Sequence, residues 1–138
     1  MYSSIVIAAA LFNEGATTRA ALKKAQTLLD DGGKITLVHV IDEVPGYVAA
    51  AIPKEHMTAR RREVEDQLAA IAAESGGPEV RTIIREGQPS ASILGAAQEI
   101  GADLIMIASH KPGLSDYFIG STAARIVRHA QVSVLVSR

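Results

Sequence analysis

The stretch ADLIMIASHKPGLSDYFIGSTAARIVRHAQVSVLVS, residues 102–137, contains the pattern that decides the fold. It begins with the apolar run 102–108 and continues through a polar loop that contains a Pro-Gly pair. Helical spacing follows from residue 120 to 130, and a second apolar run covers 132–137. A strand, a helix and a strand in this order predict parallel pairing through a right-handed crossover.

The rest of the chain repeats this alternation. It predicts one five-stranded α/β domain over residues 1–138, a doubly wound parallel sheet of order 3-2-1-4-5 with helices on both faces. The first predicted helix is expected to stop at Gly32-Gly33, and the third is expected to be capped by Ser90. The other strands are predicted at 4–9, 34–41 and 79–86, and the other helices at 17–31, 54–75 and 90–101.

Composition excludes several classes of protein. The 138 residues are 48% hydrophobic and 21% charged, as in a globular chain. A net charge of −1 gives no reason to expect nucleic acid. The absence of cysteine rules out disulfides and thiolate metal sites. Without a signal peptide or an apolar stretch of about 20 residues, the chain is expected to be cytoplasmic, with no membrane partner.

The helix that begins at Gly120 lies where this architecture binds ligands, at the carboxyl ends of the strands between which the winding reverses. Its first N–H groups lack intrahelical partners, and its dipole favours anions. Gly120 lets a ligand approach the backbone, while Ser121 and Thr122 offer hydroxyl donors. These features predict a phosphate site. The alternative is that Ser121 only caps its own helix.

The residues after the fourth predicted strand resemble the universal stress protein family (the UspA superfamily). Members that bind ATP carry Gly, two residues, Gly, nine residues, and then Gly followed by Ser or Thr. Here Ala108 and Lys111 stand at the early glycine positions, eight residues separate Lys111 from Gly120, and Gly120-Ser121 match. ASHKP and GSTAARIVRHAQVSVLV are most similar to the F- and G-type branch, and the resemblance covers the whole chain. It implies a Rossmann-like fold of the adenine nucleotide alpha hydrolase type.

The resemblance further implies a stress-response or signalling module that binds ATP or another adenine nucleotide, with Mg²⁺ held through the phosphates, and acts by binding rather than turnover. The main chain of Val40 would meet the adenine edge, and Ile107 and Ala108 would line the base and sugar. The helix start would hold the phosphates. The implied nucleotide-binding residues are Ala8, Ala10, Val40, Ile107, Ala108, Ser109, Lys111, Gly120, Ser121 and Thr122.

One departure from the family pattern bears directly on affinity. Family members that bind ATP usually end the first strand with an Asp that hydrogen-bonds the ribose, and this chain has Ala10 there. Losing a charged hydrogen bond costs roughly 1.5–3 kcal/mol, or about 10- to 150-fold in affinity. Asn13 or Glu14 could substitute for the missing carboxylate.

Two other classes of function remain as alternatives. The first is a nucleotide-independent module that contacts an unknown protein partner and keeps only a vestigial nucleotide site. The second is a slow ATP-hydrolysing or phosphotransfer enzyme, which would need a general base beside the phosphates. The sequence positions no such base there.

Two groups of polar residues have simpler interpretations than a site. His39 lies within a buried strand, which indicates a core histidine whose hydrogen bonds are satisfied. The triplet Arg60-Arg61-Arg62 is followed by Glu65 and Asp66, each four residues after an arginine. That spacing predicts a solvated helix face with paired charges.

The last strand must lie at an edge of the predicted sheet. Its sequence, VSVLVS, contains no lysine, proline or other device that usually blunts such an edge. Pairing with a second copy around a two-fold axis would satisfy both edges at once. Universal stress proteins commonly dimerise through this strand, so we expect a homodimer with antiparallel pairing near Val134, flanked by Val132 and Val136. The alternative is that a helix of the same chain covers this edge.

Overall fold

The sheet of the computed structural model, which describes residues 1–42, 45–76, 79–108 and 120–137, has five parallel strands. Their order is β3-β2-β1-β4-β5, which confirms the predicted α/β fold and the reversal of winding between β1 and β4. The strands are β1 Tyr2–Ala8, β2 Leu29–Asp42, β3 Val80–Gly87, β4 Leu104–Ala108 and β5 Ser133–Ser137.

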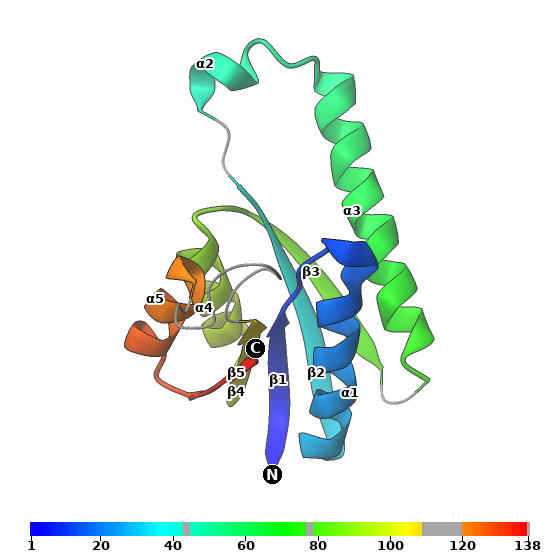
Figure 1. The fold of residues 1–138 in the computed structure, drawn as a ribbon, viewed down its shortest axis with the longest axis vertical. Coiled ribbons are helices and arrows are strands. Elements are labelled where there is room, and N and C mark those ends of the chain that lie inside the picture. Colours follow the sequence, from blue (N-terminus) through cyan, green and yellow to red (C-terminus); the bar gives the residue numbers. More distant parts are fainter. Residues whose placement is uncertain (43–44, 77–78, 109–119, 138) are drawn as a thin grey trace.

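Helices cover both faces of this sheet (Figure 1). Within the described residues these helices are the 3₁₀ turn η1 Asn13–Gly15, then α1 Ala16–Leu28, α2 Gly46–Ala49, α3 Lys54–Glu74, α4 Pro89–Ile100 and α5 Ser121–His129. None of them is long and apolar enough to cross a membrane. The two layers follow from the alternation of side chains along β1. Ile5 and Ile7 are buried with residues of α1 and α3, whereas Val6 is buried with residues of α4 and α5.

The predicted stop of the first helix was wrong by three residues. Helix α1 ends at Leu28, and Leu29 is already extended, with φ −84° and ψ 134°. Leu29 pairs with Tyr2 at the start of β1, so residues that the local sequence assigned to the helix belong to a strand instead. Gly32 does have a left-handed φ of +78°, but this turn lies inside β2 rather than at a helix end.

The predicted cap of α4 was also wrong. Gln88 occupies the N-cap position, and its Oε1 accepts a hydrogen bond from the Ala91 N–H at 2.7 Å. Ser90, expected to be the cap, is buried and donates its Oγ–H to the same oxygen at 2.8 Å. Pro89 explains the shift, because proline favours the first helical position and moves the cap to the residue before it.

The segment from Pro45 to Glu63 forms an arm that extends past the carboxyl edge of the sheet (Figure 1). It comprises α2, the connection that follows, and the first half of α3. No residue of this arm is buried. Helix α3 first enters the core at Val64, and Leu68 and Ile71 continue that contact toward its end.

Candidate functional site

The predicted site lies at the carboxyl edge of β1 and β4, which are neighbours at the reversal of winding. Ile5, Val6 and Ile7 pair with the first three residues of β4, so both strands end at the same edge. Helix α5 begins at that edge, after the residues that follow β4. The fold therefore places its switch point where the sequence predicted a ligand.

Three predicted site residues lie together on one face of the sheet. Ile107 is 8% exposed and belongs to the core beneath α4 and α5. Ala8 and Val40 are partly buried and pack against the same core. Because the Ile107 side chain is buried there, it can form a floor but cannot reach out to a ligand.

The chain that leaves β1 is held by internal hydrogen bonds. The Ala9 N–H donates to the Val38 carbonyl at 2.8 Å and extends the pairing with β2. The Nδ1 atom of His39 lies 2.9 Å from the Ala9 carbonyl oxygen. A carbonyl only accepts, so this nitrogen carries the proton. The predicted hydrogen bonding is found for this one ring nitrogen, and His39 is half-buried rather than enclosed in the core.

Ala10 is fixed by one hydroxyl group. The Ala10 N–H donates to Thr18 Oγ1 at 2.8 Å, and the same hydroxyl donates to the Ala10 carbonyl at 2.8 Å. Thr18 lies on α1 and is only 1% exposed. Both main-chain polar groups of Ala10 are thus paired within the chain, and its methyl group offers nothing to hydrogen-bond a ribose.

The turn after Ala10 has an unusual backbone. Asn13, Glu14 and Gly15 all have positive φ, at 53°, 57° and 77°. Gly15 is buried, and a Cβ atom there would come within 2.7 Å of Ile71 Cδ1, so both its left-handed φ and its packing against α3 favour glycine. Asn13 and Glu14 are exposed at the carboxyl edge of the sheet, on the loop where a substitute for the missing carboxylate was predicted.

The start of α5 has no capping side chain among the residues that the structure describes. Gly120 is the N-cap residue, in an extended conformation with φ −61° and ψ 157°. Ser121 is therefore the first helical residue rather than the cap, which contradicts the alternative interpretation. Ser121 is exposed and Thr122 is partly exposed. The first N–H groups of α5 have no intrahelical partners, and the helix dipole adds positive character at this point.

A cavity of about 270 Å³ adjoins the end of β4 on the α1 side of the sheet. The polar side chains of its lining are those of Thr17, Lys24 and Ser137, none of which was predicted from the sequence. Thr17 and Lys24 lie seven positions apart on one face of α1, with two lining alanines between them, and such a face of small residues is typical of ordinary helix packing. The lining residues are Ala16, Thr17, Ala20, Ala21, Lys24, Ile107, Ala108 and Ser137.

Within the part of the chain that the structure describes, no three His, Asp or Glu side chains converge on a common metal position.

Two of the predicted site residues, Ser109 and Lys111, lie in 109–119, outside the described residues. A second cavity, of about 200 Å³, includes His129 and Gln131 and lies near the C-terminal ends of α4 and α5, remote from the predicted residues.

A five-stranded parallel sheet with this reversal of winding and helices on both faces is a doubly wound α/β fold, the class in which ligand sites lie at the switch point. The protein-family model described as "Universal stress protein family" matches residues 1–138. The chain belongs to the universal stress protein family, as its resemblance implied.

Curated relatives agree with this assignment. Universal stress protein G of Escherichia coli O157:H7 is 29% identical over 146 residues, with 100% of both chains covered. A universal stress protein of Thermus aquaticus is 29% identical over 127 residues, which cover 91% of this chain and 92% of that one.

Solved structures share the fold. The universal stress protein UspA from Lactobacillus plantarum is 21% identical, with a TM-score of 0.78 over 99% of this chain and 98% of that chain. The universal stress protein from Archaeoglobus fulgidus in complex with dAMP is 20% identical, with a TM-score of 0.63 over 99% and 98%. A universal stress protein in complex with cAMP is 18% identical, with a TM-score of 0.62 over 99% and 97%.

Proposed function

We propose that this chain is an adenine-nucleotide-binding module, with ATP as the leading ligand, that acts in stress response or signalling by binding rather than turnover. The adenine edge meets the main chain at Val40, and the sugar lies over Ala8 and Ala108. The phosphates bind at Gly120, Ser121 and Thr122. The observation that carries this proposal is the N-terminus of α5 at the switch point of the sheet, where no side chain outside 109–119 caps the helix.

The chemistry of the helix start supports an anion rather than a neutral ligand. Its free N–H groups and exposed Ser121 hydroxyl are all donors, and no acidic residue lies in the first turn of α5. Relatives with this fold have been solved with cAMP and with dAMP, which supports an adenine nucleotide as the class of anion. Mg²⁺ binds through the phosphates, which supply the hard oxygen ligands that this ion prefers.

The site binds nucleotide weakly, because Ala10 supplies no carboxylate to the ribose. Calorimetry on protein stripped of bound ligand tests the proposal, with ATP titrated to millimolar concentration in the presence of Mg²⁺. We expect measurable heat for the wild type and none for Gly120→Val, since two methyl groups would block the phosphate approach. Gly46→Val is the matched control, because no atom lies within 4 Å of a Cβ added at Gly46. A folded wild-type protein that gives no heat would refute the proposal.

A nucleotide-independent interaction module is the second candidate. The pairing of both Ala10 main-chain groups with Thr18 favours it, because the ribose side of the site then offers no free main-chain group at that residue. Mass spectrometry of small molecules released from purified protein separates the two candidates. Released ATP or AMP supports the nucleotide module, and product formed over time would instead indicate an enzyme.

We also propose that the protein is a cytoplasmic homodimer that pairs through β5. This strand ends the sheet and pairs with β4 only, among the strands that the structure describes. Val132, Val134 and Val136 pack partly onto the core beneath α4 and α5, so the contact between copies would use the main-chain edge more than these side chains. Light scattering at micromolar protein concentration tests the oligomeric state. Val134→Pro should give a monomer because it removes an N–H, whereas Val134→Thr should remain a dimer.

A further inference from the structure

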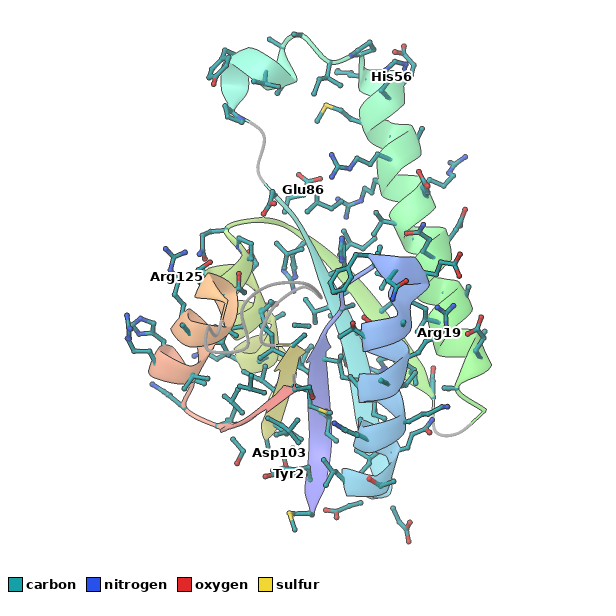
Figure 2. All side chains as sticks on the ribbon, in the orientation of Figure 1. Tyr2, Arg19, His56, Glu86, Asp103 and Arg125 are labelled. Carbon is teal, nitrogen blue, oxygen red and sulfur yellow. The ribbon has the colours of Figure 1, made fainter. Side chains whose placement is uncertain are left out.

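The inner side of the arm holds a groove that the nucleotide proposal does not use. It has a volume of about 310 Å³ and lies between the arm and the ends of β2 and β3. Figure 2 labels His56 near the outer end of α3 and Glu86 at the sheet edge below it. The groove is lined by Ile41, Ile52, His56, Met57, Thr58, Arg60, Arg61 and Glu86.

Two large apolar residues of the arm are exposed. Met57, in the groove lining, is 42% exposed, and Tyr47, on α2 and outside that lining, is 82% exposed. The residues of α3 up to Glu63 have no core contact, and an isolated helix of this length is marginal in water. Large exposed apolar residues on one projecting element are typical of a surface that another molecule covers.

The charge of the groove lining indicates what that molecule carries. Arg60, Arg61 and Glu86 give the lining a charge of +1 in a chain whose net charge is −1, whereas the other charged residues of the arm line a different pocket. Arg61 is paired with Glu65 at 3.5 Å and with Glu86 at 3.0 Å, as the sequence predicted for Glu65. Arg60 has Val64 four residues later, and no ion pair joins it to a described carboxylate.

The combination favours a protein segment over a phosphate ligand or nucleic acid. Ile41, Ile52 and Met57 give the groove an apolar floor, which suits an aliphatic side chain and would contribute little to a phosphate. Glu86 and Arg61 of the lining pair with each other at 3.0 Å, which leaves Arg60 rather than the cluster of cations that a phosphate group would need. A flexible methionine in the floor also adapts to side chains of different shape.

We propose that this groove docks a segment of another protein that carries apolar side chains flanked by carboxylates. An aliphatic side chain fills the space between Ile41, Ile52 and Met57. The neighbouring carboxylates lie beside Arg60 and His56 at the rim. This docking needs no nucleotide, so it stands whether or not the site at α5 binds ATP.

Methyl NMR on the full chain tests the proposal, with the methyl groups of Ile41, Ile52 and Met57 as reporters. The probe is a short synthetic peptide of glutamate and leucine. A lysine–leucine peptide and a glutamate–serine peptide are matched controls for charge and for apolar character. We expect the three methyl signals to shift with the glutamate–leucine peptide alone.

A charge reversal at the rim completes the test. Arg60→Glu should weaken peptide binding by about tenfold or more, while Arg128→Glu on the distant α5 should leave it unchanged. Unchanged methyl signals elsewhere verify that each variant is folded. Equal shifts with the lysine–leucine peptide, or no shift with glutamate–leucine, would overturn the proposal. So would shifts that depend only on protein concentration or on added ATP, because the occupant would then be a second copy or the nucleotide.

Discussion

Replacing Thr18 by valine gives the sharpest test of what holds the candidate site in shape. Valine matches threonine in volume but has no hydroxyl, so both the N–H and the carbonyl of Ala10 lose their partner at 2.8 Å. A polar group left unsatisfied in a buried position costs about 1–3 kcal/mol. Ala10 is only partly buried, and water can replace some of this bonding. We therefore expect a loss of about 2–4 kcal/mol for the two groups together.

Urea unfolding measures this loss directly. With a slope near 2 kcal/mol per molar urea, which is typical of small domains, the midpoint should fall by about 1–2 M. Thr18→Ser is the matched control, because it keeps the hydroxyl and loses one methyl group from a residue that is 1% exposed. Its midpoint should stay closer to that of the wild type. If valine shifts the midpoint less than serine does, the two hydrogen bonds do not stabilise the turn and the reasoning is wrong.

Three further changes test separate features. Gly15→Ala should lower the free energy of unfolding more than Gly32→Ala in the same urea assay. Both glycines have a left-handed φ, but only at Gly15 would a Cβ atom lie against Ile71, at 2.7 Å. Equal losses would mean that the contact with Ile71 does not contribute. Burial raises the pKa of Asp103, but the hydrogen bonds that it accepts at the start of β1 outweigh this and lower the pKa below its usual value. Its stabilising effect is therefore present above the usual pKa and is lost as pH falls through the lowered one, so Asp103→Asn should destabilise at neutral pH and flatten the acid limb of the stability profile. Ala10→Asp should tighten ATP binding by roughly tenfold in calorimetry, and unchanged affinity would mean that the ribose lies elsewhere.

The architecture could be predicted because one strong pattern repeats along the chain. Strands that are apolar on both faces alternate with segments of helical spacing, and only a few parallel topologies accommodate that alternation. The two errors have different causes. Leu29 is a strand residue because Tyr2 pairs with it, and this contact is not visible in a local window of sequence. The cap of α4 lies at Gln88 because proline follows, a local signal that the prediction did not use.

The candidate site was predictable to the extent that it depends on local sequence. Gly120-Ser121 predicted the helix start at the switch point, and α5 begins there without a side-chain cap from the described residues. The cavity beside Thr17 and Lys24 was missed, because its shape depends on how α1 lies against β4. The bonds between Thr18 and Ala10 were missed for the same reason, since they join a buried helix residue to a loop eight positions earlier.

These two bonds change how the alanine at position 10 should be understood. The absence of a side-chain carboxylate that could bind the ribose would usually suggest that the loop has also lost its ordered conformation. This loop is nevertheless fixed by hydrogen bonds, at Ala10 by Thr18 and at Ala9 by His39. A carboxylate restored at position 10 would stand on a backbone that is already ordered, so binding would not have to pay for ordering it. In the proposed site, the backbone beside the ribose is therefore ordered and only the carboxylate is missing, which is why one substitution is expected to recover affinity.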